Sequence, residues 1–268
     1  MKHLLALLTA APLVTGCMVS MESNNPPIGS SNSVGNGTVV IEERILPSFQ
    51  TAETHGDMDI LILEGNSYEA SVTLDGNLQG YLRTSVQGGN LIVDFTRPVR
   101  TSVRPTVTIT VPALEAIHHY GSGLVTVEHE TWRHEMIVDV VGNGSLVFTG
   151  AAERLVATHL GTGTLELIGY ADVLEASVES SGDLLGDGML AADVIAKVYG
   201  SGDVTLDLDY GSWVNASIYG SGNVEWWGFP TKTVYTMSGS GRIIEHRILG
   251  KAAAGSIAQK FKALKPKG

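Results

Sequence analysis

The sequence contains a single cysteine, Cys17, and few aromatic side chains, which make up 6% of its 268 residues. One cysteine excludes an intramolecular disulfide framework, so the fold must rest on its core and its backbone hydrogen bonds. Lys and Arg are also scarce, at 17 against 28 Asp and Glu, for a formal net charge of -11. Six of these bases fall after position 246, where the chain has no acid. The body before them is therefore strongly acidic, which argues against nucleic-acid binding.

Long apolar runs are absent except near the N-terminus, where 4–14 is too short to span a membrane as a helix. Lys2 precedes this run, and Leu13-Val14-Thr15-Gly16-Cys17 follows it, an arrangement that resembles a bacterial lipoprotein signal. Residues 1–16 are then a cleaved signal peptide, and Cys17 carries the lipid that attaches the protein to a membrane. The alternative is an ordinary secretory signal with an incidental cysteine. Met18 stands where an Asp would favour the inner membrane, so the sorting pattern of such lipoproteins predicts the outer membrane.

The segment that follows, residues 17–37, is rich in Ser, Asn, Gly and Pro. This composition is typical of a disordered tether. It predicts a linker between the lipid and a folded domain that covers residues 38–250.

A short glycine-centred unit recurs seven times within this domain. Its second glycines are Gly123, Gly144, Gly163, Gly182, Gly202, Gly222 and Gly241, spaced 21, 19, 19, 20, 20 and 19 residues apart. A fixed period near 20 residues is the signature of a stacked solenoid.

Apolar residues alternate with polar ones on both sides of each glycine unit, as in Ala196 and Val198 before it and Val204 and Leu206 after it. Such alternation is typical of β-strands with one buried face. The sequence therefore predicts an all-β fold, a parallel β-helix with rungs of about 20 residues whose glycines form tight corners. A propeller is the alternative, but its blades need about 40 residues each.

Both ends of the domain depart from the repeat. Residues 38–112 predict less regular strands that cover the N-terminal end of the solenoid, since open rungs need an atypical end unit. In the basic tail, residues 251–268, the spacing of Ile257, Phe261 and Leu264 predicts a short amphipathic helix. This helix is expected to be a cap or frayed tail against the last rung, or else a basic helix that contacts anionic lipid or another acidic partner.

Register places some surface side chains in columns. Tyr199 and Tyr219 share one repeat position and are expected to stack outward, where they would bind a glycan or peptide face or simply stabilise neighbouring rungs. Asp183, Asp203 and Asn223 share another position, about 5 Å apart from rung to rung. We expect this second column to be a solvated polar ladder; the alternatives are a cation site and, together with the tyrosines, a ladder that faces a ligand.

No catalytic residues, cofactor or metal ligands are predicted. The histidines lack a zinc-ligand spacing, and His119 and His159, two rungs apart at one repeat position, are expected to be partly buried packing residues. The serines between the glycines lack the strand–turn–helix context of a nucleophile elbow. Nearly uniform rungs also leave little loop material from which to build a catalytic cleft.

Three segments carry a resemblance to a known family: Ile45-Leu46-Pro47-Ser48-Phe49, the stretch ITVPALEAI at 109–117, and Tyr120-Gly121-Ser122-Gly123. Together with the later Gly-Ser-Gly units they resemble the GIN-domain family, also described as putative autotransporter adhesin, head domain, over about residues 44–247. The resemblance implies an exported protein, often lipoprotein-borne, with a right-handed β-helix. It supplies no catalytic or binding residues.

The leading hypothesis is a non-enzymatic, lipid-anchored envelope protein with an adhesion-type binding domain for an envelope or surface glycan or protein. The first alternative is a structural or signalling envelope component that acts through protein contacts. The second is a carbohydrate-active β-helix enzyme that would use Asp183 and Asp203.

Overall fold

A computed structural model describes residues 33–250, 252 and 255–266, and all of them belong to one compact unit, Asn32–Gly268. The predicted signal peptide, Cys17 and most of the predicted tether lie outside these residues. Among the described helices, none is long and apolar enough to cross a membrane.

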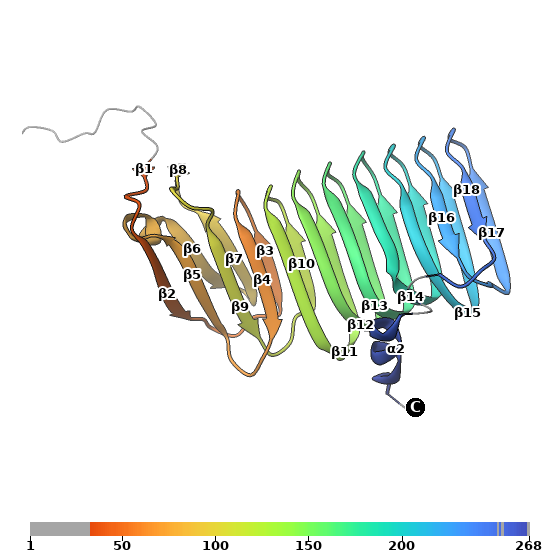
Figure 1. Cartoon of the computed structure of the whole chain (residues 1–268), viewed down its shortest axis with the longest axis horizontal. Coiled ribbons are helices and arrows are strands. Elements are labelled where there is room, and N and C mark those ends of the chain that lie inside the picture. The colour runs from red at the N-terminus through yellow and green to blue at the C-terminus, as the bar shows by residue number, and fades with distance from the viewer. Residues whose placement is uncertain (1–32, 251, 253–254, 267–268) are drawn as a thin grey trace, which may run out of the picture. The chain divides into compact units, whose positions relative to one another are not determined.

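The unit is a β-solenoid of parallel rungs, as the repeat predicts (Figure 1). Five long strands form its middle: β11 (Leu124–Val140), β12 (Ser145–His159), β13 (Thr164–Val178), β14 (Asp183–Val198) and β15 (Val204–Ile218). Each of these strands bends half-way along and passes from one face of the solenoid to the other. Its two halves correspond to the two short strands that the sequence predicts for each rung. Three shorter strands complete the last rungs: β16 (Val224–Trp227), β17 (Lys232–Met237) and β18 (Ile243–His246).

The core is a set of straight columns because the rungs stack in register. Leu155 pairs with Leu174, Leu174 with Val194, and Val194 with Val214, and all four side chains are buried. Stacking at the strand spacing of about 4.8 Å brings each apolar side chain against its equivalents above and below. The alternating pattern thus produces one continuous core.

The glycine units form the tight corners because the backbone of one rung lies against the backbone of the next. A Cβ atom on Gly202 would stand 1.9 Å from the carbonyl oxygen of Gly182, and one on Gly222 would stand 1.9 Å from that of Gly202. No side chain fits at that distance, so these corners require glycine.

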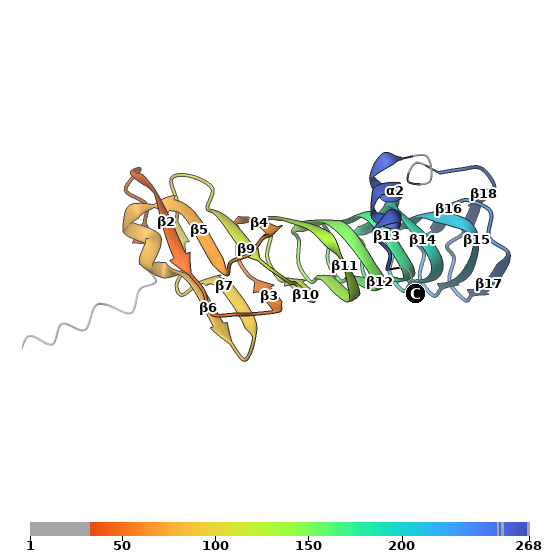
Figure 2. The same cartoon turned by 90° about the horizontal axis from the view of Figure 1, so that it is seen from below.

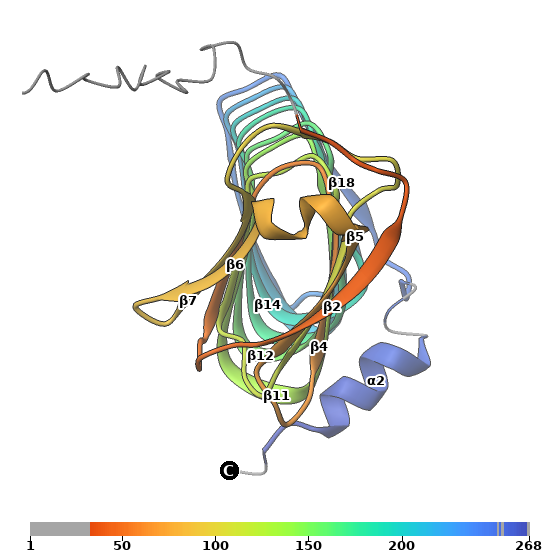
Figure 3. The same cartoon turned by 90° about the vertical axis from the view of Figure 1, so that its left-hand side faces the viewer.

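An irregular β-structure covers the N-terminal end, as predicted. Antiparallel pairs join β2 (Val39–Ile45) to β5 (Glu69–Asp75), β5 to β9 (Thr106–Val111), and β6 (Leu82–Gln87) to β7 (Asn90–Phe95). The first parallel rungs comprise β3 (Thr51–Thr54), β4 (Asp59–Glu64) and β10 (Ala116–His119). A 3-10 helix, η1 (Gly76–Tyr81), crosses the end of the solenoid and buries Leu78 (Figure 3).

The predicted tether is too long at its C-terminal side. Ser33–Val34 forms β1, which pairs with β8 (Val99–Arg100), and the backbone of Gly37 donates a hydrogen bond to Asp75. Residues 33–37 therefore belong to the folded unit, because the edge of the N-terminal structure offers them backbone partners.

The C-terminal helix exists, but the expected contact with the last rung is wrong. Helix α2 (Ser256–Ala263) lies beside the middle of the solenoid, where it packs on β13 (Figure 2). Its Ala258 and Phe261 are buried against Tyr170 and Leu190, which project at the bends of the long strands. The Lys260 ammonium lies 2.9 Å from Glu130, the Lys265 ammonium lies 2.7 Å from Asp172, and Lys262 pairs with Asp209. This bend offers both an apolar patch and acids to the basic helix, which explains its position.

Candidate ligand-binding face

One face of the solenoid presents aromatic and apolar side chains to solvent. It consists of the strand segments that lead into the glycine corners, namely β10, the second halves of β11 to β15, and β17. The side chain just before each corner points outward, and the ones exposed here form what we call the corner ridge, made of Tyr120, Val141, Leu160, Tyr199 and Tyr219.

Tyr199 and Tyr219 stack on each other at the C-terminal end of this ridge, as the repeat predicts. Their ring centroids are 4.9 Å apart, and the ring planes differ by 9°. Both remain nearly half exposed, at 47% and 46%. Backbone hydrogen bonds fix the pair, since the amide of Tyr219 donates to Val198 and that of Tyr199 donates to Val178. The pair is thus a rigid aromatic surface that is open to a ligand.

The ridge continues toward the N-terminal end with Leu160, Val141 and Tyr120, exposed at 41%, 36% and 42%. Beyond Tyr120, the ring of His55 stacks on it at 4.9 Å between centroids. Glu179 interrupts the apolar column and is exposed between Leu160 and Tyr199. An exposed acid is therefore set within an otherwise apolar ridge.

A shallow hollow of about 140 Å³ adjoins the tyrosine pair. Tyr199 forms one wall, Ile195 and Val156 supply apolar surface, and Lys197 and Glu179 bring charges of opposite sign. Further along the same face, the Lys232 ammonium lies 5.7 Å from the centre of the Trp213 ring. Aromatic and apolar groups can pack on the ring faces of a polar ligand, and charged groups can hydrogen-bond to its hydroxyl groups.

The predicted polar ladder is also present, and its atoms are used within the fold. A carboxylate oxygen of Asp183 accepts the backbone N–H of Asp203 at 2.8 Å, and one of Asp203 accepts the backbone N–H of Asn223 at 2.7 Å. The side-chain oxygen of Asn223 accepts the N–H of Arg242 at 3.0 Å. Each side chain therefore caps the start of the next rung. A ligand-facing role for these residues remains a prediction.

A family model described as "Putative auto-transporter adhesin, head GIN domain" matches residues 48–230. The chain belongs to this family. No curated protein matches the chain.

Several solved structures share the fold of this GIN domain. A putative adhesin from Bacteroides fragilis is 19% identical with a TM-score of 0.74, and the match covers 79% of this chain and 99% of that one. One from Parabacteroides merdae is 19% identical with a TM-score of 0.65, and the match covers 80% and 98%. A Parabacteroides distasonis structure described as a putative lipid binding protein is 21% identical with a TM-score of 0.65. The match covers 80% of this chain and 99% of that one. At these identities the likeness concerns the fold alone.

The buried histidines of the GIN domain serve its packing. His119 and His159 are 1% and 0% exposed, so they are fully rather than partly buried as expected. The Nδ1 atom of His119 lies 2.8 Å from the Thr54 hydroxyl, and its Nε2 atom lies 3.1 Å from the Gly123 carbonyl oxygen. Burial lowers the pKa of both imidazoles, because it disfavours their charged form. Within the described part of the chain, no three His, Cys, Asp or Glu side chains are grouped to hold a metal ion.

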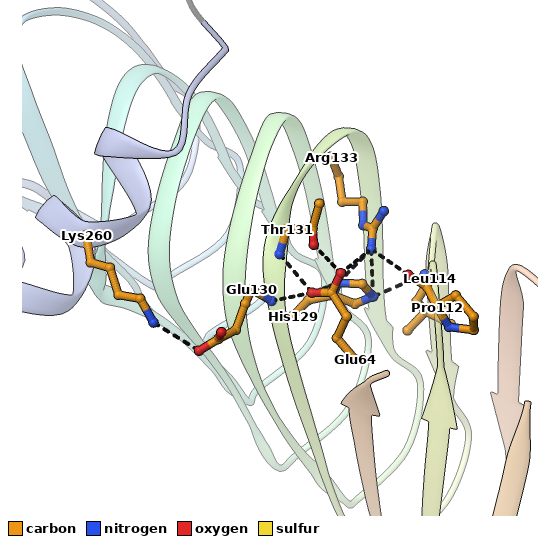
Figure 4. A network of polar contacts seen from close by, with 8 residues as sticks. All are labelled: Glu64, Pro112, Leu114, His129, Glu130, Thr131, Arg133 and Lys260. Carbon is orange, nitrogen blue, oxygen red and sulfur yellow. Dashed lines mark hydrogen bonds and ion pairs between the residues drawn. The ribbon is translucent and has the colours of Figure 1, made fainter. Parts of the chain in front are cut away.

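The densest polar network of the GIN domain surrounds Glu64, the last residue of β4, and sequence reasoning missed it (Figure 4). Its carboxylate accepts the backbone N–H groups of Glu130 and Thr131 at 2.7 and 2.8 Å, and it lies 3.0 Å from Nδ1 of His129. Arg133 adds a contact to Glu64 at 3.2 Å.

This network lies at an irregularity in β11, where the register of its pairing with β12 shifts between Glu128 and Trp132. Burial acts to raise the pKa of Glu64, but hydrogen bonds from Thr131 and Glu130 and the nearby His129 outweigh it, so the pKa is lowered. Burial, then the Arg133 charge, lowers the pKa of His129. With His129 only 1% exposed, the geometry is that of a structural brace. No local spacing could have revealed it, because Glu64 and His129 are 65 residues apart.

Proposed function

We propose that this GIN domain is a non-enzymatic binding module of the bacterial cell envelope, and that its corner ridge binds an extended glycan. The observation that carries the proposal is the rigid, half-exposed stack of Tyr199 on Tyr219, beside a hollow with Lys197 and Glu179. Aromatic faces pack on the apolar faces of sugar rings, while neighbouring charged groups hydrogen-bond to hydroxyls. The names of the related structures, putative adhesins, agree with a binding role.

The absence of catalysis is part of this proposal. The two carboxylates that the enzyme alternative would use, Asp183 and Asp203, each have an oxygen that accepts a hydrogen bond from the backbone of the next rung. The buried histidines, His119 and His159, are 1% and 0% exposed and so are not accessible to a ligand on the ridge. A glycan bound on the ridge would therefore meet the aromatic rings and the charged side chains of Lys197 and Glu179.

The anchor is likewise proposed from the sequence. Cys17 would carry the lipid, Met18 would direct sorting to the outer membrane, and the Ser/Asn/Gly-rich residues after them would tether the folded unit. Labelling cells with a radioactive fatty acid tests this directly. Label in the wild-type protein that is lost in Cys17→Ser supports the anchor, and an unlabelled wild-type protein contradicts it.

Capture from isolated cell envelopes tests the binding role. The wild-type chain and Tyr199→Ala/Tyr219→Ala are used as bait, with Tyr210→Ala as a matched control because Tyr210 is 87% exposed away from the ridge. The proposal predicts that envelope polysaccharide is retained by the wild type and the control and lost with the double variant. Retention of a protein in place of a polysaccharide would favour the structural or signalling alternative.

A further inference from the structure

The C-terminal end of the solenoid is unlike its N-terminal end because strand edges remain open there. Within the described residues, strand β17 pairs only with β15, and β18 pairs only with β16. Each of the two last strands therefore offers a free row of backbone donors and acceptors. Such edges readily pair with another strand, and natural solenoids normally cover them.

Apolar side chains meant for a core are exposed at the same end. Tyr235 pairs with Ala216 and Met237 with Ile218, so both occupy inward-facing columns whose earlier members are completely buried. Tyr235 is nevertheless 37% exposed and Met237 is 52% exposed, since no further rung follows them. Phe229, just before β17, and Val234, within it, are exposed as well. Exposed apolar surface that is concentrated in one place marks an interaction site.

The described chain does not cover this end. After β18 it runs back along the solenoid to α2, which packs on β13. The one inward-facing acid of the last rung, Glu245, is satisfied locally. It accepts the Tyr235 hydroxyl at 2.8 Å and lies 3.2 Å from the Arg247 guanidinium. Removing water from this end would therefore leave no unpaired carboxylate.

We propose that this end binds the same end of a second copy of the chain. A two-fold axis across the solenoid reverses strand direction, so the free edges meet as antiparallel pairs and both are satisfied by one closed contact. Tyr235 and Met237 of the two copies then complete a shared core. Like charges oppose this contact less than they oppose a lateral contact between two strongly acidic bodies. Residues 231–247 hold three bases (Lys232, Arg242, Arg247) and one acid, whereas the chain as a whole has a net charge of -11.

Sedimentation velocity of the full-length chain over a range of micromolar concentrations tests the proposal. A Cys17→Ser background prevents cross-linking through the only thiol. The proposal predicts a concentration-dependent dimer that Met237→Asp weakens at least about tenfold, since a charge would enter the shared core. Ile45→Asp is the matched control at the opposite end of the solenoid, where Ile45 is 94% exposed, and it should leave the dimer intact.

Amide hydrogen exchange gives an independent readout that does not depend on how the variant folds. In the wild type, exchange in β17 and β18 should slow at concentrations where the dimer forms, while exchange in β2 should not change. A wild type that stays monomeric would overturn the proposal. So would a dimer that is unaffected by Met237→Asp, or exchange in β17 and β18 that does not respond to concentration.

Discussion

At the scale of single residues, the corner glycines are needed for construction. Each lies where two backbones approach so closely that even a methyl group has no room. The glycine pattern in the sequence therefore marks where rungs touch. The side chains that stand beside the corners are free to vary, and Tyr199 and Tyr219 are examples.

Gly202→Ala should destabilise the solenoid by about 3 kcal/mol or more, because the new methyl group would stand 1.9 Å from the Gly182 carbonyl oxygen. Chemical denaturation would measure the change. Gly80→Ala is the control, since a Cβ there meets no atom within 4 Å, and its effect should stay within about 1 kcal/mol. Equal stability of the two variants would contradict the close-packed corner.

The buried histidines predict a pH dependence of stability. Burial lowers the pKa of His159 in the folded state, whereas the unfolded chain protonates this side chain below about pH 6.5. Its contribution to stability is thus fully present above that pH and falls as the pH drops toward the lowered pKa.

His159→Val should reduce the loss of melting temperature between pH 7.5 and pH 5, with little change at pH 7.5. Valine already occupies the equivalent positions 140 and 178 in the neighbouring rungs. Melting curves at both pH values measure this. A His159→Val variant that keeps the wild-type slope would contradict this account.

The sequence predicts the tyrosine pair because a constant period fixes which residues become neighbours. It does not predict the hydrogen bonds of Asp183 and Asp203 to the next rung. Those depend on side-chain rotamers and on the exact start of each strand. The Glu64 network depends on pairing between β4 and β11, two strands that are far apart in the sequence, so no local sequence pattern predicts it.

At the scale of elements, the strands follow the sequence closely and the tail does not. Alternation and glycine spacing determine the rungs, since each is repeated and reinforced by its neighbours. The spacing of Ile257, Phe261 and Leu264 predicts a helix but not its contact. Its position depends on an apolar patch with three acids that is formed by residues far away in the sequence.

Phe261→Ala should release α2 from the solenoid. An eight-residue helix is not stable alone in water, so loss of its main buried side chain, worth about 3 kcal/mol, should also unfold it. Amide exchange over 256–263 should then become fast, while the rungs keep their protection. Ile257→Ala, at a 52%-exposed position, should leave α2 docked.

Salt concentration gives a second test of what holds α2 against the solenoid. The three lysine–carboxylate pairs are partly exposed and contribute at most about 1 kcal/mol each. High salt alone should therefore loosen α2 without releasing it. Release by salt in the wild type would mean that charge, rather than Phe261, holds the helix.

At the scale of the whole folded unit, the surfaces differ in what they offer. One face bears the corner ridge, α2 covers the bend opposite the corners over β12 to β14, and the N-terminal end is closed by β-structure and η1. The C-terminal end alone among the described surfaces combines free strand edges with exposed core positions. Binding through the ridge and pairing through this end use different residues, so each can fail without the other.

The central claim is that the ridge binds an extended glycan and leaves it intact. The decisive measurement is calorimetric titration of the polysaccharide captured from envelopes into the wild type, Tyr199→Ala/Tyr219→Ala and Tyr210→Ala, followed by chromatography of the recovered polymer. The account predicts an affinity at least about tenfold weaker for the double variant, an unchanged affinity for Tyr210→Ala, and a polymer of unchanged length. Equal affinities for the wild type and the double variant, or a shortened polymer, would contradict it.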